Sequence, residues 1–389
     1  MEFRIDAAQR NFRDEVCRLL RSERSAKIIG STGRFADGGD ALAWELYQDL
    51  GERGWLAANW PEHLGGVDRT VLDAAAVTEE LHWHGVHDTL HVVTVDFVGY
   101  FLLLAGTPEQ RERHLPAMAA GRSFACTLHS EPEAGSDLAA LRTTAVPQPD
   151  GGFLLTGTKL WSLWTDRCDV ALCSARVPTP GVEPTGADGI TLFLVSMSAP
   201  GVLVDPVATT ADEQFAEVRL RDVRVDAADV VGQVGHGWAL LTSVLAIERT
   251  GLEQSAKIRH WLDVVVAHAR ATGALADPAV ADTVAALDAE VEAARLMSWR
   301  CLSDLHHGAL DPAYSAMAKY VASELAERIA DLAADLAGAD VAVPRSAGAT
   351  DGGFAEWIRR EAPGVSISAG TSEMMLQIVA ASRGTGAVA

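Results

Sequence analysis

Four histidines stand close together in the sequence, and histidine is a common ligand of zinc and other metal ions. They are His82, His84, His87 and His91. No cysteine or acidic residue stands near them at the spacing of a known zinc site. We therefore interpret the four as surface histidines at the end of a helix, and the sequence predicts no metal site.

Thiol chemistry is the next possibility, and the cysteines argue against it. They are five in number, and no two form a C-x-x-C pair: Cys17, Cys126, Cys168, Cys173 and Cys301. An odd number without paired spacing is typical of reduced thiols in the cytosol. The first residues mix charges and contain no apolar core of a signal peptide, and no later run is long enough to span a bilayer. We expect a cytoplasmic protein.

The overall charge limits the partners of the chain. Of 389 residues, 53 are acidic and 32 are basic, which gives a net charge of −21. Such a surface repels nucleic acid and anionic lipid, so we exclude nonspecific binding of either. An anionic ligand would need a local cluster of Arg or Lys. The 48% hydrophobic content is enough for two or three structural units with buried cores.

The elements that position any site fall into three stretches. Residues 1 to about 120 have the apolar spacing of helices, for example over Ala41–Arg53, Val71–His82 and Val92–Ala105, and Pro108 suits the first turn of another. Residues 123 to about 232 contain short apolar runs broken by Gly, Pro and Asp, which indicate a compact antiparallel β domain.

From Gly237 onward the pattern is helical again. Long segments are expected over Trp238–Thr272, Asp277–Leu305 and Pro312–Leu336. The Gly-, Ala-, Ser- and Pro-rich stretch 338–353 predicts a loop before a last helix that starts near Thr371. This order predicts a β unit inserted between two helical bundles.

Six motifs occur in order along nearly the whole chain. They are Gly51–Leu56 with Trp60-Pro61-Glu62, Ser130–Leu138 (SEPEAGSDL), Thr156–Trp161 (TGTKLW), Gly189–Val202, Phe215–Val225 and Gly370–Glu373. Together they resemble the flavin-dependent acyl-CoA dehydrogenase family. The resemblance implies an α+β, mainly α fold. Its parts would be an N-terminal helical domain (1–122), a middle antiparallel β domain (123–233) and a C-terminal four-helix-bundle domain (234–389).

The resemblance also implies a reaction, in which a base removes the α-proton of an acyl thioester while FAD accepts a hydride from the β-carbon. Most of the family carries the base just before the C-terminal Gly-Thr, but that position is Ala369 here. A minority branch carries it immediately before an Arg on a C-terminal-domain helix, which corresponds to Glu248. We predict Glu248 as the base. The alternative is a solvated helix carboxylate.

Three further residues are implied to bind the thioester substrate. Ser136 resembles the residue that meets the thioester end, and Arg249 and Gly370 resemble residues beside the acyl-CoA. Other interpretations stay open: the Ser136-Asp137 pair would also suit a helix N-cap, and Arg249 would suit an i,i+4 ion pair with Glu253.

The implied FAD contacts come from two strands and the last helix. On the first strand, backbone N–H groups and hydroxyls would donate to the flavin, and on the second a tryptophan would shield it. The residues are Thr127, Leu128, His129 and Ser130, then Trp161, Ser162 and Leu163. Thr371 and Glu373 correspond to phosphate-contacting positions at a helix N-terminus.

The sequence departs from the family at several of these positions. Leu163 stands where a hydroxyl usually approaches flavin N5, and Trp164 stands where Gly is common. Arg270 keeps the Arg that reaches FAD across a dimer, but the neighbouring Phe and Gln are missing. The resemblance still implies Arg270 as an FAD contact, without the Phe and Gln that usually accompany it.

Three functions remain open at this point. The first is dehydrogenation of an acyl-CoA or acyl-carrier thioester, with an electron-transfer flavoprotein as acceptor. The second is an FAD-poor or non-catalytic subunit of a heteromer of related chains, and the third is a flavin-dependent oxygenase or N-oxidase. A homo-oligomer or such a heteromer is implied in each case.

Overall fold

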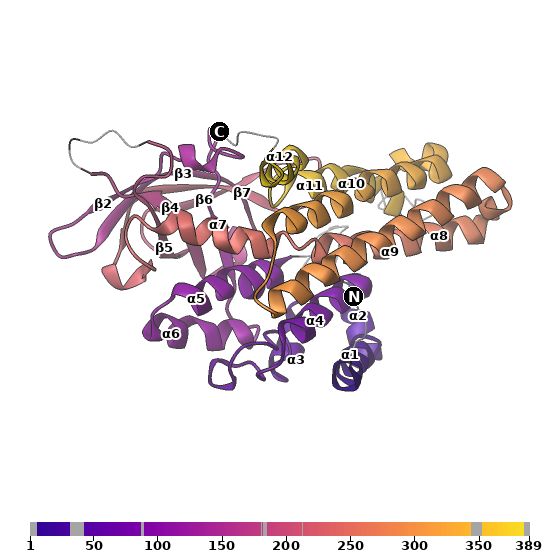
Figure 1. Cartoon of the computed structure of the whole chain (residues 1–389), viewed down its shortest axis with the longest axis horizontal. Helices are drawn as coiled ribbons and strands as arrows, with labels where there is room; N and C mark the ends of the chain where they lie inside the picture. The colour runs from indigo at the N-terminus through magenta and orange to yellow at the C-terminus, as the bar shows by residue number, and fades with distance from the viewer. Residues whose placement is uncertain are drawn as a thin grey trace.

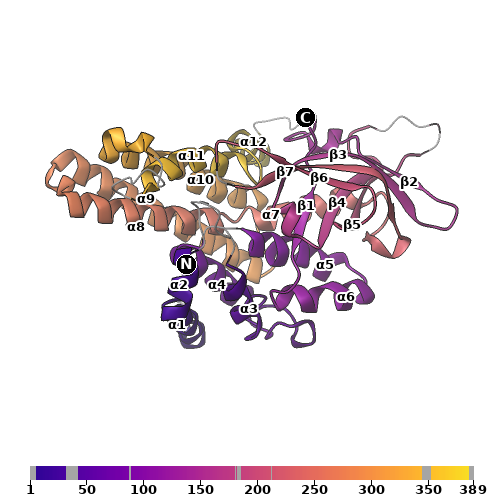
Figure 2. The ribbon, with the colours of Figure 1, turned by 180° about the vertical axis from the view of Figure 1, so that it is seen from behind.

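The computed structural model describes residues 6–31, 43–86, 89–179, 181, 185–211, 213–343 and 352–384, with the backbone alone at 30–31 and 246–248. A β-sheet lies beside two groups of helices, one from each end of the chain (Figure 1). The same arrangement is visible from behind, where the long helices α8 and α9 extend away from the sheet (Figure 2).

The N-terminal helices begin at sequence-encoded caps. In chain order the segments are α1 (Ala7–Leu20), α2 (Glu23–Ser31), α3 (Trp44–Gly51), η1 (Glu62–Leu64), α4 (Val71–Trp83), η2 (Val92–Gly99), α5 (Tyr100–Ala105) and α6 (Pro108–Ala119). Asp6, Thr70 and Thr107 each form a capping box, in which the side chain accepts from the N–H three residues later. The segment η2 is a π-helix rather than part of one α-helix over Val92–Ala105.

The middle of the chain forms one eight-stranded sheet. Its strands are β1 (Ala125–Leu128), β2 (Thr144–Pro147), β3 (Phe153–Leu163), β4 (Val170–Arg176), β5 (Ile190–Ser196), β6 (Val202–Val207), β7 (Phe215–Val225) and β8 (Val230–Val231). The order is β6-β7-β3-β2-β4-β5-β8, and β1 pairs with β4. Most pairs are antiparallel, but β4 runs parallel to β1 and to β2, so the sheet is mixed.

The C-terminal region consists of α7 (Gly237–Glu248), α8 (Leu252–Thr272), α9 (Pro278–His306), α10 (Pro312–Ala337), α11 (Phe354–Ile367) and α12 (Ser372–Ser382). The single helix expected over Trp238–Thr272 is wrong. The chain breaks at Gly251, whose φ of 75° is left-handed. The helix α11 was not predicted, because Pro363 and Gly364 are poor helix formers.

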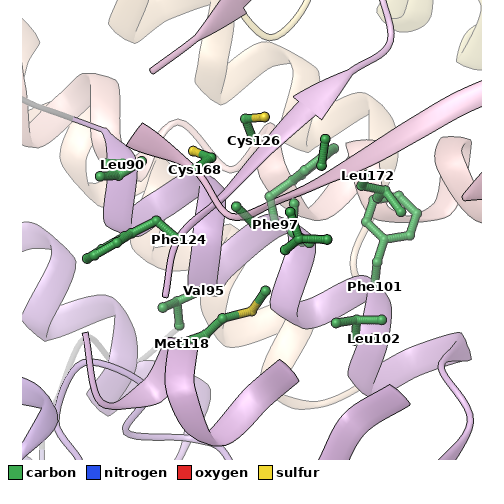
Figure 3. Close-up of a cluster of buried hydrophobic side chains, with 14 of the residues drawn as sticks. Leu90, Val95, Phe97, Phe101, Leu102, Met118, Phe124, Cys126, Cys168 and Leu172 are labelled. Atoms are coloured by element: carbon green, nitrogen blue, oxygen red, sulfur yellow. The ribbon is translucent and has the colours of Figure 1, made fainter. Parts of the chain in front are cut away.

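Two hydrophobic cores hold these parts together. The N-terminal helices share one core with the sheet, and α8 to α11 form a second. In the first core, Phe97 and Phe101 from η2 and α5 pack near Leu172 of β4 (Figure 3). The predicted fold class is confirmed: helical, mainly β and helical regions follow one another. The predicted boundaries at 122 and 233 stay predictions.

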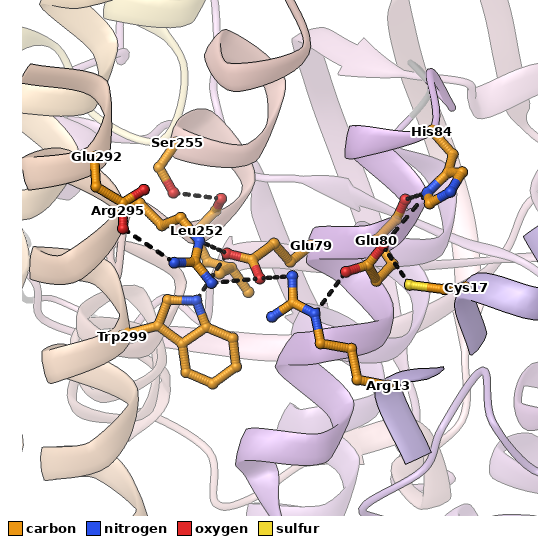
Figure 4. Close-up of polar contacts among 10 residues, drawn as sticks. All are labelled: Arg13, Cys17, Glu79, Glu80, His84, Leu252, Ser255, Glu292, Arg295 and Trp299. Atoms are coloured by element: carbon orange, nitrogen blue, oxygen red, sulfur yellow. Dashed lines mark hydrogen bonds and ion pairs between the residues drawn. The ribbon is translucent and has the colours of Figure 1, made fainter. Parts of the chain in front are cut away.

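A buried carboxylate joins the N-terminal helices to the C-terminal ones. Glu79 of α4 is fully buried and accepts from Arg295 Nε at 2.8 Å and from Trp299 Nε1 at 2.7 Å, both on α9. Arg13 of α1 contacts it at 2.6 Å from the other side (Figure 4). Two guanidinium groups and an indole thus compensate the desolvation of this carboxylate.

Candidate functional site

The end of β1 and the middle of β3 are joined by a buried ion pair. Lys159 of β3 is fully buried, and its Nζ lies 2.7 Å from Glu131 Oε1 and 3.0 Å from the carbonyl oxygen of His129. Glu131 also accepts the N–H groups of Arg142 at 2.6 Å and Thr143 at 2.9 Å. This pair fixes the segment that the sequence assigns to the cofactor.

The same cation governs the charge of Glu131. Burial raises the pKa of this carboxyl, but the Lys159 ammonium and the two peptide N–H groups outweigh it and lower the pKa below its usual value. The carboxylate is therefore ionised at neutral pH.

Side chains on these two strands leave an open, partly apolar surface. Trp161 is 54% exposed and has a φ of 63°, while Thr127 and Ser130 are partly exposed. In the described part of the chain, neither the Thr127 nor the Ser130 hydroxyl makes a hydrogen bond. Trp161 is thus not a core tryptophan, and two hydroxyl donors stand free on the neighbouring segment.

Leu128 and Ser162 are buried, so only their backbones are available to a ligand there. The Nδ1 atom of His129 is hydrogen-bonded to the Ser174 hydroxyl at 3.2 Å, and its buried Nε2 has no hydrogen-bond partner in the described ranges. Burial lowers the pKa of His129 to about 3, with the Lys159 charge as a second cause. The ring is neutral at physiological pH.

Trp164, the second departure from the family pattern, points into the first hydrophobic core. It is buried, with a φ of 55°, and its indole N–H has no hydrogen-bond partner in the described residues. Leu163 is partly buried and packs against the same core. Trp164 therefore leaves the surface beside Trp161 open.

A second group of predicted residues meets at the loop between α11 and α12. Ala369 and Gly370 both have left-handed backbones, with φ of 55° and 96°. Arg249 Nε donates to the Ala369 carbonyl at 3.1 Å. Within the described residues, the N–H groups of Ala369 and Gly370 make no backbone hydrogen bond. The loop thus offers free N–H donors next to the end of α7.

Glu248 is the last residue of α7, and its side chain lies outside the described residues. The helix itself packs against β5, η2, α5 and α10. It ends at Glu248 and α8 begins at Leu252, so Arg249 and Glu253 do not share a helix. Glu253 instead lies 3.6 Å from Lys257.

Thr371 caps the last helix, since its hydroxyl accepts from the Met374 N–H at 3.3 Å. Glu373 is exposed in the first turn of α12, and its own backbone N–H and the Thr371 hydroxyl lower its pKa. Both features match an electropositive helix N-terminus.

Two predicted residues stand apart from these groups. Ser136 is exposed, and Asp137, which begins a short 3₁₀ turn, makes no capping bond from its side chain, so the expected N-cap is wrong. Arg270 is exposed in the last turn of α8, at the end that extends farthest from the sheet (Figure 2). Within one chain it does not meet the other predicted residues.

The interpretation of the histidines as surface residues is wrong at two positions. His82 and His91 are buried, and their Nε2 atoms have no hydrogen-bond partner among the residues that the structure describes; His87 lies outside these residues. Burial lowers the pKa of each buried ring to about 3. No group of three metal-binding side chains occurs in the part of the chain that was described.

Sequence reasoning missed the positions that hold the site. Glu131 and Lys159 lie inside quoted motifs but carried no role, and a charged residue between apolar strand residues was the available signal. Lys319 is one of two cations in the Ala-rich α10, the other being the exposed Arg328, and nothing in its own segment marked it. Asp96, a lone acid in the apolar η2, accepts from the Thr78 hydroxyl at 3.2 Å.

Comparison with known proteins agrees with this architecture. The models of the N-terminal, middle and C-terminal domains of acyl-CoA dehydrogenase match residues 6–122, 126–223 and 235–383. The chain therefore belongs to the acyl-CoA dehydrogenase family. It is an oxidoreductase of the acyl-CoA dehydrogenase type.

Relatives and solved structures of similar length support the assignment. The acyl-CoA dehydrogenase FadE26 of Mycobacterium tuberculosis is 30% identical over 385 residues, which is 95% of this chain and 94% of that protein. The Tcur3481-Tcur3483 steroid ACAD is 29% identical with a TM-score of 0.87, and the match covers all of both chains. The ChsE4-ChsE5 complex of M. tuberculosis contains a chain that is 27% identical with a TM-score of 0.86, again over both full lengths.

None of the helices in the described ranges has the length and apolar character that crossing a membrane requires.

Proposed function

We propose that this chain catalyses the α,β-dehydrogenation of an acyl thioester, with FAD as hydride acceptor and Glu248 as the base that removes the α-proton. The chemistry requires a positioned carboxylate, donors for the enolate oxygen that develops, and a surface closed to water. FAD, when bound, supplies the electron acceptor.

The hydrogen bond from Arg249 Nε to the Ala369 carbonyl carries this proposal. Arg249 follows Glu248 directly, so this bond places the end of α7 next to residue 369, where most of the family carries its base. Ala369 has no proton-accepting group. A carboxylate at the end of α7 would act as the base at the same place, although it comes from a different helix. The free N–H groups of Ala369 and Gly370 would donate to the enolate oxygen.

The residues on β1 and β3 fit a flavin. The Thr127 and Ser130 hydroxyls are without partners in the described residues, and the exposed Trp161 ring offers an apolar surface beside them. These groups would hold FAD and exclude water from one of its faces. The Thr371 turn at the start of α12 would receive a phosphate.

The test of the base is Glu248→Gln in the flavin-loaded enzyme, assayed with acyl-CoA thioesters of several chain lengths. We expect kcat to fall by about 10²–10⁴-fold, because an amide accepts no proton, while KM changes only a few-fold. Glu253→Gln, the next described carboxylate along the chain, is the control and should keep normal turnover. A Glu248→Gln enzyme that works within a few-fold of the parent would rule out this assignment.

Moving the base tests the geometry separately. In the double variant Glu248→Gln with Ala369→Glu, a carboxylate returns beside Arg249, and we expect turnover at least about tenfold above Glu248→Gln alone. Glu248→Gln with Ser368→Glu, which changes the exposed neighbouring residue, should show no such gain.

A second candidate, one subunit of a heteromer of related chains, is favoured by Leu163 and Ala369, which replace residues of the family's usual site. Arg270, in the last turn of α8, would suit a contact across a subunit interface in a homomer or a heteromer alike. The similar ChsE4-ChsE5 structure is named as a complex of two proteins. The purified chain distinguishes the cases: one flavin per chain supports a homomer, whereas colourless protein that gains flavin only with a related chain supports the heteromer.

A further inference from the structure

The loop Ser368–Gly370 is shaped by neighbours rather than by its own sequence. Ala369 and Gly370 adopt consecutive left-handed conformations, and such a conformation costs an alanine about 1 kcal/mol. A Cβ on Gly370 would lie 2.8 Å from Met375 Cε and 3.3 Å from an Arg249 nitrogen. The surrounding groups must therefore hold this backbone in place.

A buried lysine from α10 supplies much of that hold. Lys319 is fully buried, and its Nζ donates to the carbonyl oxygens of Ser366 at 2.9 Å and Gly370 at 2.8 Å. Ser366 is in the last turn of α11, where carbonyl groups lack partners within the helix and attract a cation. One ammonium thus ties the end of α11 to the turn that precedes α12.

The same part of α10 also receives the end of α7. Gly251, in the turn after Arg249, lies so close to α10 that a Cβ there would be 3.0 Å from the Ala318 carbonyl group. Farther along, Glu324 accepts from the Ser372 hydroxyl at 2.6 Å. This helix therefore sets the position of the α7–α8 turn and of the start of α12 together.

We propose that Lys319 is a positioning residue, which fixes the Ala369–Gly370 loop against Arg249 and thereby the place where Glu248 acts. Lys319 on α10 and Arg249 in the turn after α7 hold adjacent carbonyl groups of one loop. With the carbonyls occupied in this way, the loop N–H groups stay free for substrate. The kinetic part of this inference rests on the proposed function, and the structural part does not.

The experiment compares Lys319→Met, Lys319→Gln and Lys319→Arg with Arg328→Met as the control. Arg328 is on the same helix but is exposed, where it pairs with Glu290. Amide hydrogen exchange of the peptide that covers 366–376 is measured without substrate. We expect exchange to be at least about tenfold faster in Lys319→Met at Ser368, Met374 and Met375, whose N–H groups are hydrogen-bonded on either side of the loop. The increase should be smaller in Lys319→Gln and absent in Arg328→Met.

Steady-state kinetics of the same proteins form the second readout. Lys319→Met should lower kcat by about 10–100-fold with a smaller effect on KM, because a displacement of about 1 Å has consequences of this size. Lys319→Arg, which keeps the charge and two donors, should recover most of the loss. The Lys319→Met effect should also shrink when Arg249→Met is already present, since both act on one loop.

Unchanged exchange and unchanged kcat in Lys319→Met would overturn the proposal. If Lys319→Met does not fold, Lys319→Gln replaces it in the test, because glutamine lacks the charge and is shorter than lysine. Parent-like exchange and kcat in Lys319→Gln would then overturn the proposal. If the parent enzyme turns over no acyl thioester, the proposed function fails, while the exchange data still decide the role of Lys319.

Discussion

At the scale of single residues, the loop Ser368–Gly370 lacks the carboxylate that most of the family carries there, but its backbone is held by specific contacts. Ala369 occupies the position where most relatives carry the base, yet the backbone there is held as firmly as a catalytic loop requires. A loop that had lost all function would have no need of two cations on adjacent carbonyl groups. The arrangement fits a site whose base has moved to another element.

The Lys159–Glu131 pair allows a prediction about cofactor binding. Lys159→Met leaves Glu131 buried without its cation, which costs about 3–5 kcal/mol, and it releases the His129 carbonyl. We expect a lower free energy of unfolding by urea and weaker FAD binding by fluorescence titration. Arg142→Met, which removes only the exposed ion pair with Glu133, should change unfolding by less than about 1 kcal/mol. Equal effects of the two variants would contradict this account.

The pH dependence of the same pair has a definite sign. Because the folded pKa of Glu131 is lowered, its stabilising contribution is present above the unfolded pKa of about 4.3 and is lost as the pH falls through the folded pKa. The difference in unfolding free energy between parent and Lys159→Met should therefore shrink below about pH 4. Urea titrations at pH 7 and at acid pH measure it, and a constant difference would refute the ion pair as its cause.

At the scale of elements, the turn between α7 and α8 determines where the predicted base stands. Position 251 requires a glycine for two reasons. Its backbone is left-handed, and α10 lies so close that a side chain would collide with it. Gly273, at the other end of α8, has nearly the same backbone but faces open space. A comparison of the two glycines therefore separates the effect of packing against α10 from the effect of the left-handed backbone.

We predict that Gly251→Ala is more harmful than Gly273→Ala. Both substitutions carry the conformational cost of about 1 kcal/mol, but only Gly251→Ala forces α8 away from α10. Thermal unfolding should show a larger loss for Gly251→Ala, and kcat should fall only in that variant. Equal loss in both variants would mean that the contact with α10 has no role.

The sequence predicted the main elements for reasons that the structure explains. The helices that start near Val71 and Pro108 followed from apolar spacing and from a proline suited to a first turn, and the structure adds caps at Thr70 and Thr107. The motifs identified β3 and β7. The break at Gly251 escaped notice because apolar spacing continues across it. The helix α11 was missed because Pro363 and Gly364 oppose helix formation locally, while tertiary packing on α10 supports it.

The site residues were predictable only where a motif carried them. Thr127, Ser130 and Trp161 follow from resemblance, are partly or largely exposed, and stay predictions as cofactor contacts. The contacts of Lys319 with residues about 50 positions later were not predictable, because no local pattern encodes a pairing across such a distance.

At the scale of the whole molecule, Glu79 links the N-terminal group of helices to the C-terminal group. Its partners come from α1 and α9, which are nearly three hundred residues apart in the chain (Figure 4). Hydrophobic contacts between α4 and α8 accompany this ion cluster. The relative position of the two helical groups therefore depends on one buried carboxylate.

Glu79→Gln should destabilise the protein by about 3–5 kcal/mol, because two largely buried guanidinium groups lose their shared counterion. The loss is measured by urea unfolding. Glu45→Gln is the matched control: its ion pair with Arg24 is exposed, and its removal should cost less than about 1 kcal/mol. A Glu79→Gln protein as stable as the control would show that packing alone joins the two groups.

The central claim is that the carboxylate of Glu248 takes the α-proton of an acyl thioester. Its most direct test is a single anaerobic turnover, in which bleaching of the bound flavin is followed after mixing with acyl-CoA. We predict that Glu248→Gln binds flavin normally but bleaches at least about 10³-fold more slowly than the parent. Bleaching by the variant at nearly the parental rate would contradict the claim.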